Sequence, residues 1–395
     1  MQEKVLILNG TINEIPIIKA AKDMGYYVIT SGNMPNLPGH KFADEYICAD
    51  YSNGETMLKI VQENNIDGVI SCANDFGSVT ASYIGEKMNW KGHDTYKNAL
   101  LLHNKDKFMK YFKQKNFPTA WFKIFNDIDA AKDFCRNCSD YPVIVKATDL
   151  TGGKGISRAE NFNDAAAAIE RAFKISRNKI VLIEPFLDGV QQSIVAFLVN
   201  RKVKIVSSSD IFCWRNPYLV QAETYPATNF DAVKNILCNI METMAVDLNL
   251  CDGILSFQYI VKNGVPYVID MMRRCFGNET LLLADERTGF NWERAYIMAS
   301  LGLDCSNLQC QIPTSKFCGH YGIMARKNGV FKSFKIPDYL QMKIFKQTVN
   351  FKPGDIVENY LTDRMAHIYY RYDDFNEMQR DIKRCDADIK VEMED

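Results

Sequence analysis

A glycine-rich loop bordered by lysines is the strongest chemical signal in the chain. The segment 143–157 reads VIVKATDLTGGKGIS, in which an apolar run carries Lys146 and a polar loop then supplies Gly152, Gly153, Lys154 and Gly155. Glycines permit positive φ and let backbone N–H groups converge on an anion, and lysines add charge for phosphate oxygens. The GxxxxGK[ST] order of a Walker A loop is missing, so the segment is another kind of phosphate loop or a flexible turn with two solvated lysines.

A second group of chemical residues lies near the segment PYVIDMMRRCFGN. The dipeptide Asn263–Gly264 predicts a β-hairpin, which would set Gln258 on one strand and Asp270 on its partner. Two side-chain oxygens brought together suit a hard cation, which prefers oxygen ligands. The alternative is that Asp270 only ends a strand and forms a surface ion pair with Arg273 or Arg274.

Two more segments flank the glycine-rich loop along the chain. Asp106 and Lys107 open a helical stretch about forty residues upstream. Downstream, Glu184 closes a buried strand, and the extended EPFL that begins there has backbone groups able to pair with an adenine edge.

The elements that position these residues differ between the parts of the chain. Residues 4 to 95 alternate short apolar strands with amphipathic helical segments, which predicts a parallel, doubly wound sheet. No GxGxxG follows the first strand, so nicotinamide cofactors are not expected. Asn74 and Asp75 follow a strand of this section, where they contact a substrate or cap the next helix. From residue 118 to about 310 strands and helices are mixed, and MAHIYYRY near the end predicts a strand followed by a helix and a last strand.

Composition excludes several classes of protein. A net charge of −1 argues against a broad nucleic-acid footprint, and no run approaches the ~20 apolar residues of a membrane span. The start MQEKVLILNG has only four consecutive apolar residues, which predicts a first strand and no signal peptide. The 12 cysteines are scattered singly, so we expect reduced thiols in a cytoplasmic protein.

These motifs, in this order, resemble the ATP-grasp superfamily of carboxylate–amine ligases, a resemblance that covers nearly the whole chain. It implies an α/β and α+β fold: a doubly wound parallel domain at residues 1–95, a split ATP-grasp domain at 96–310, and a small C-terminal α+β domain at 311–395.

The resemblance also implies roles for individual residues. It assigns binding of the ATP phosphates to Lys107, Lys146 and the loop 151–155. It assigns catalytic roles to Arg274 and Lys154. Glu184 and the backbone of Phe186 and Leu187 would bind the adenine, and Gln191 would bind the ribose. Gln258 and Asp270 would bind a metal ion. Met272 departs from the family, which has asparagine there, and a thioether is a poor ligand for Mg²⁺.

The implied activity is phosphorylation of a carboxylate by ATP with Mg²⁺ or Mn²⁺, followed by attack of an amine on the acyl phosphate. The partners would be small-molecule acids and amines, with neither nucleic acid nor membrane, and the resemblance suggests a second copy of the chain in a homodimer. Arg273, Trp214 and Arg215 are candidate substrate contacts, although Trp214 could equally pack between domains. Two alternatives stay open: use of bicarbonate, as in carbamoyl-phosphate synthetase or biotin carboxylase, and a nucleotide-binding protein without turnover.

Overall fold

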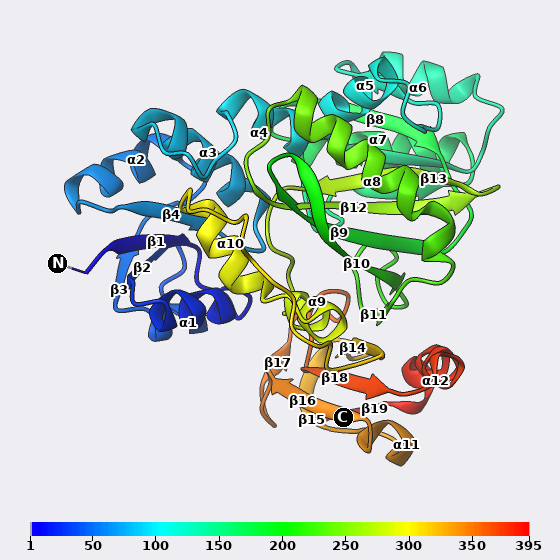
Figure 1. The fold of residues 1–395 in the computed structure, drawn as a ribbon. Helices are drawn as coiled ribbons and strands as arrows, with labels where there is room; N and C mark the ends of the chain where they lie inside the picture. The colour runs from blue at the N-terminus through cyan, green and yellow to red at the C-terminus, as the bar shows by residue number, and fades with distance from the viewer. Residues whose placement is uncertain (1, 395) are drawn as a thin grey trace.

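The computed structural model describes residues 2–394 and shows three packed sections (Figure 1). A cleft lies between them. The first section is a four-stranded parallel sheet of order β3-β2-β1-β4. Its elements are β1 (Lys4–Leu8), α1 (Ile15–Asp23), β2 (Tyr27–Gly32), η1 (Pro38–Phe42), β3 (Glu45–Cys48), α2 (Gly54–Glu63), β4 (Gly68–Ser71) and α3 (Asp75–Met88).

Side chains of β1 alternate between the two faces of this sheet. Val5 and Ile7 pack against α1 and a later helix, α10 (Trp292–Ser300), whereas Leu6 and Leu8 pack against α2 and α3. The doubly wound prediction is therefore confirmed. The strand order reverses between β1 and β4, so the carboxyl ends of these strands form the crevice where such sheets bind ligands.

Two helices lead from this section to a small antiparallel sheet of order β5-β8-β6-β7. The helices are α4 (Tyr96–His103) and α5 (Lys105–Gln114). The sheet and its covering helices are β5 (Lys123–Phe125), α6 (Ile128–Arg136), β6 (Val143–Ala147), β7 (Ile156–Ala159), α7 (Phe162–Ile175) and β8 (Val181–Pro185). The glycine-rich loop joins β6 to β7 and lies at the edge of the cleft.

A large eight-stranded sheet forms the other side of the cleft, in the order β13-β12-β9-β10-β11-β14-β18-β16. Its elements are β9 (Gln191–Val199), β10 (Lys202–Phe212), β11 (Ala222–Tyr225), β12 (Gly253–Lys262), β13 (Val265–Met272), β14 (Phe317–Ile323), β16 (Ile344–Val349) and β18 (Ala366–Tyr372). Helix α8 (Phe230–Asp247) covers the face away from the cleft, and α9 (Thr280–Thr288) follows β13.

The β12–β13 hairpin forms as predicted. Asn263 and Gly264 both have positive φ, 53° and 77°, the conformation that a tight two-residue turn requires. The register pairs Gln258 directly with Asp270.

The last section adds a short sheet, β17-β15-β19, under the end of the large one. Its elements are β15 (Gly329–Lys335), α11 (Asp338–Gln341), β17 (Ile356–Val357), α12 (Phe375–Asp388) and β19 (Lys390–Met393). The strand, helix and strand predicted at the end of the chain are β18, α12 and β19. The large sheet runs from β13 to β18 across residue 311, so the division at residues 95 and 310 stays a prediction. Among the described residues, no helix is long and apolar enough to cross a membrane.

Candidate active site

A cavity of about 370 Å³ lies between the small sheet, the large sheet and the carboxyl ends of the first section's strands. Its floor is one face of the large sheet. Directly paired residues of neighbouring strands point to the same face, and here the paired row is Asp270, Gln258, Ser193 and Ser209. The intervening residues Phe257 and Ile194 point the other way into the core against α8. The alternation of β9, β12 and β13 therefore places a polar row under the cavity.

A β-bulge shapes the end of this row. The register of β13 shifts beside Gln258, so Ile269 is an extra residue without a partner in the ladder. The carbonyl of Ile269 accepts a hydrogen bond from Lys146 Nζ at 3.2 Å. Lys146 also forms a buried ion pair with Glu184 at 2.5 Å. The bulge thus anchors the lysine of β6 over the hairpin that carries Asp270.

Three cations gather at this end of the cavity, and each has an acidic partner. They are Lys146 with Glu184, Lys105 with Asp270 at 3.3 Å, and Arg274 with Asp75. Lys105, at the start of α5, also donates to the carbonyl of Leu150 and lines the cavity. These pairs leave the end nearly neutral, and an entering polyphosphate would compete with three carboxylates for three cations.

The structure corrects the prediction for Lys107. That side chain is exposed on α5 and does not line the cavity, whereas Lys105, two residues earlier, is 4% exposed and does. Residues that are two positions apart on a helix point to opposite faces, so only one of Lys105 and Lys107 can reach the cleft. Lys105 therefore replaces Lys107 as the candidate for phosphate binding.

Arg274 lies where the β13 segment meets the first section. Its Nε and Nη2 donate to the two carboxylate oxygens of Asp75 at 2.8 and 2.9 Å, and Nη1 donates to the Cys275 carbonyl. Burial by itself would raise the pKa of the Asp75 carboxyl, but the Arg274 guanidinium holds that pKa below its ordinary value. Asp75 begins α3, and Asn74 caps that helix by accepting from the Gly77 N–H at 3.1 Å. The capping alternative for Asn74 is the one the structure shows.

The residues at Asp270 fit a metal ion that arrives with a nucleotide. Asp270 supplies a carboxylate, and the amide of Gln258, across the ladder, is held by a 2.9 Å bond from Gln191 Nε2. Within residues 2–394 no three acids, histidines or cysteines cluster as a complete metal site. One carboxylate, one amide oxygen and substrate phosphates form a donor set typical of Mg²⁺. Met272 also lines the cavity and adds no oxygen.

The glycine-rich loop covers the cavity from the small sheet. Thr151, Gly152 and Gly153 line it, whereas the side chain of Lys154 is exposed. Gly153 has φ 75°, and a Cβ there would lie 2.6 Å from the carbonyl oxygen of Tyr218. The loop therefore sits against the segment before β11 so closely that only glycine fits. A catalytic role for Lys154 stays a prediction that requires the loop to move.

We expect Gly153→Ala to raise the KM for ATP by about 5- to 30-fold, because the left-handed backbone costs ~1–2 kcal/mol with a Cβ and the methyl group displaces the loop. Gly152→Ala is the matched control. Gly152 also has positive φ, 64°, but nothing lies within 4 Å of its added Cβ, so its effect should be smaller. Equal effects in steady-state kinetics would show that contact with Tyr218 is unimportant.

The opposite end of the cavity is mainly apolar and lies beside the end of β8. Ile144, Ile156 and Ile260 form its walls, and Phe186 and Leu187 lie along its rim. The N–H of Phe186 is already used, since it donates to the Pro142 carbonyl at 2.9 Å. In the described chain the N–H of Leu187 and the carbonyl of Phe186 have no backbone partner. The backbone groups that could contact adenine are therefore the N–H of Leu187 and the carbonyl of Phe186.

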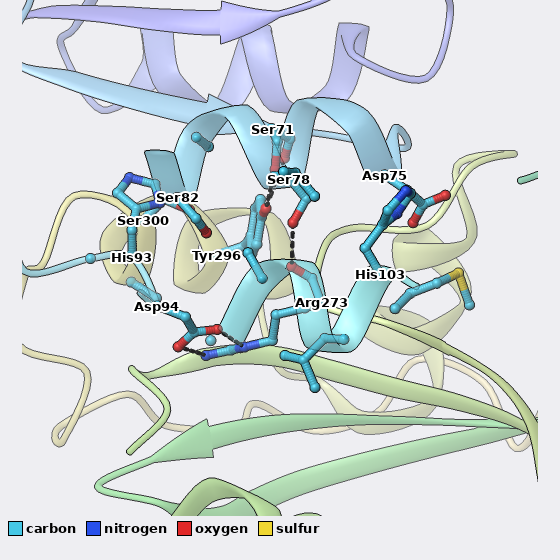
Figure 2. A pocket seen from close by; sticks show the side chains of 18 of the residues that line it. Ser71, Asp75, Ser78, Ser82, His93, Asp94, His103, Arg273, Tyr296 and Ser300 are labelled. Atoms are coloured by element: carbon cyan, nitrogen blue, oxygen red, sulfur yellow. Dashed lines mark hydrogen bonds and ion pairs between the residues drawn. The ribbon is translucent and has the colours of Figure 1, made fainter. Parts of the chain in front are cut away.

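Arg273 lies outside this cavity. Its guanidinium donates to Asp94 at 2.8 Å and to the carbonyls of Ile254 and Cys251, and it borders a separate cavity of about 50 Å³ (Figure 2). The same figure shows Ser78 bonded to the Arg273 carbonyl. Arg273 and Arg274 are neighbours in the bend after β13, and their side chains have different partners, Asp94 and Asp75. A substrate contact by Arg273 is not supported, and the ion pair joins the first section to β13.

Trp214 and Arg215 are likewise absent from the cavity lining. Trp214 stacks on Phe212 and packs against Tyr321 of β14, and Arg215 pairs with Asp386 of α12 at 2.8 Å. The packing alternative for Trp214 is therefore the observed one. Both residues fix the loop before β11 to the last section.

Among the charged residues that line the cavity, sequence reasoning did not assign Lys105, Glu223 and Arg364, and it did not identify Asp75 as the partner of Arg274. Lys105 could have been identified from the sequence, because its spacing from the apolar residues of α5 places it on the buried face of the helix. Asp75 was identified only as a strand-end residue. Glu223 and Arg364 had no local signal, since long-range strand pairing brings them to the cleft.

Comparisons with known proteins agree with this architecture. A family model, the ATP-grasp (A) domain of phosphoribosylglycinamide synthetase, matches residues 104–212. The carbamoyl phosphate synthase large chain of Thermoanaerobacter sp. is 23% identical over 310 residues, which are 72% of this chain and 26% of that protein. The phosphoribosylamine–glycine ligase of Chlorobaculum tepidum is 32% identical over 192 residues, 43% of this chain and 44% of that protein. The chain thus spans less than half the length of either relative.

A solved structure extends the likeness to the whole chain. The crystal structure of an L-amino acid ligase from Bacillus licheniformis matches with a TM-score of 0.83 over 100% of this chain and 99% of that one, at 16% identity. At that identity the match establishes the fold only. The family model and the two relatives support the resemblance of this chain to the ATP-grasp superfamily.

Proposed function

We propose that this protein is an ATP-dependent ligase that activates a carboxylate as an acyl phosphate and joins it to an amine. The observation that carries the proposal is the convergence of Lys105, Lys146 and Arg274 at one end of a cavity whose other end is apolar. A nucleotide needs both environments, because its phosphates require cations and its base an apolar slot. The two curated relatives are named as a synthase and a ligase, which agrees with the proposal.

In the proposed reaction, the carboxylate oxygen of the substrate attacks the γ-phosphorus of ATP, and the bond to the β-phosphate oxygen breaks to release ADP. An amine then attacks the acyl carbon, phosphate leaves with the bonding electrons, and the amine loses a proton. Lys105, Lys146 and Arg274 would neutralise the phosphate oxygens as charge develops on them. Asp270 and Gln258 would hold Mg²⁺, which supplies further charge neutralisation.

Bicarbonate as the phosphorylated acid is the second candidate. Gln258 favours it, since carbamoyl-phosphate synthetases resemble this chain in having glutamine there, and one such synthase is similar over 72% of the chain.

The test is ADP and phosphate release with Mg²⁺ and ATP, measured against panels of carboxylates and amines that include bicarbonate. Release that requires one acid together with one amine supports the ligase, and release with bicarbonate alone supports the second candidate. Tight ATP binding without release on any panel would point to a nucleotide-binding protein without turnover.

A further inference from the structure

The cavity continues beyond the phosphate end into a second compartment. This compartment is lined by residues of β10 and β11, by the loop before β11 and by the segment before β18. Its lining includes Tyr218, Glu223, Asn278 and Arg364. None of these residues belongs to the three cation pairs at the phosphate end.

Arg364 is a partly buried arginine that has no acidic partner in the described chain. Arg273, Arg274 and Arg215 are each paired with an aspartate. Arg364 donates from Nη2 to the Val220 carbonyl at 2.7 Å, and its buried Nε has no hydrogen-bond partner among residues 2–394. Burying an arginine without an anion is unfavourable, so such a residue is kept for an anion that arrives from outside. Burial also lowers the pKa of the Arg364 guanidinium.

A glycine in the sheet leaves space for the side chain of Arg364. Gly322 of β14 lies under the side chain, and a Cβ there would be 3.0 Å from Arg364 Cδ and 3.1 Å from its Nε. The glycine therefore allows the arginine to lie flat over the sheet, and the bond to Val220 fixes its direction. A position defined in this way at the cavity wall is typical of a binding residue.

An acid lies on the same face of the sheet, one step along β11. Gly322 pairs with Gln221, and Glu223 is two residues further, about 7 Å along the strand. Glu223 accepts from Ser209 Oγ at 2.6 Å and contacts His320 Nε2 at 3.0 Å. A carboxylate has about four lone-pair sites, so Glu223 can still accept a bond from a ligand in the cavity. The compartment thus presents a cation and an anion separated by the length of a small ligand.

We propose that this compartment binds an α-amino acid, with its carboxylate on Arg364 and its amino group on Glu223. The inference rests on the proposed function and assigns the amino acid as the amine substrate, because its carboxylate would be bound by Arg364, which is not one of the three cations at the phosphate end. The amino group then lies toward Ser209 and Ser193, which are hydrogen-bonded at 2.7 Å and lead along the sheet floor to Gln258 and Asp270.

The test is equilibrium binding by calorimetry with the twenty standard L-amino acids as probes, on the full chain with and without MgADP. Each amino acid that binds is compared with its decarboxylated amine and its α-hydroxy acid. Arg364→Met should weaken the amino acid about 10- to 100-fold, the value of a charge-assisted hydrogen bond, and should not weaken the decarboxylated amine further. Arg364→Lys should recover part of the loss. Arg326→Met, at an exposed arginine of the same section, is the matched control.

The outcomes separate this inference from the proposed function. Unchanged amino-acid binding in Arg364→Met, or no binding of any of the twenty to the unmodified chain, would overturn the inference. MgADP binding by Arg364→Met shows that the variant is folded and that its nucleotide site is intact. Loss of phosphate release on every acid and amine, with amino-acid binding retained, would instead count against the ligase reaction.

Discussion

Lys105→Met is expected to lower ATP-dependent phosphate release by about 10²–10³-fold, the usual cost of removing one group that stabilises the transition state. Lys105 is buried at the start of α5 and forms its ion pair with Asp270 at the phosphate end of the cavity. Methionine keeps most of the length of the side chain and removes only its charge. The measurement is steady-state ADP formation, with the acid and amine found in the panel.

Lys107→Met is the matched control for this prediction. The same substitution two residues away, on the exposed side of the same helix, should leave phosphate release within about twofold, since surface changes of this kind cost little. A large loss for Lys107→Met together with a small one for Lys105→Met would restore the original assignment and contradict the structure. Thermal unfolding of both variants shows whether the helix is retained.

The error between these two lysines could have been avoided from the sequence. Three buried apolar residues of α5, Phe108, Met109 and Phe112, lie three, four and seven positions after Lys105. This is the spacing of one helix face, and Lys107 falls outside it. The comparison with the family motif selected Lys107, whereas the helical periodicity of α5 selects Lys105.

Other parts of the site could not be predicted because they depend on contacts between distant segments. The partners of Arg273 and Arg274 are Asp94 and Asp75, both in the region before the small sheet, and nothing in the local sequence selects between them. Arg364 reaches the cavity only because β18 pairs with β14, and β14 with β11. By contrast, the β12–β13 hairpin was predictable, since the turn residues Asn263 and Gly264 fix the register locally.

Asp270→Asn is expected to reduce phosphate release by about 10²–10³-fold and to weaken Mn²⁺ binding in the presence of ADP. Asp270 is the only carboxylate in the donor set proposed for the metal, because Gln258 opposite it is neutral and Met272 beside it supplies a thioether. Asparagine has nearly the same shape as aspartate and removes the negative charge, so the hairpin should fold as before. Electron paramagnetic resonance of Mn²⁺ measures the binding independently of turnover.

Met272→Asn provides the opposite change at the same site. Met272 and Asp270 lie two residues apart on β13 and line the same cavity, so an amide at 272 adds an oxygen on the side of Asp270. We expect tighter Mn²⁺ binding with ADP and undiminished phosphate release. If neither Asp270→Asn nor Met272→Asn changes Mn²⁺ binding, the metal does not bind to β13. Asp270 then acts only as the ion-pair partner that holds Lys105 in place until ATP binds.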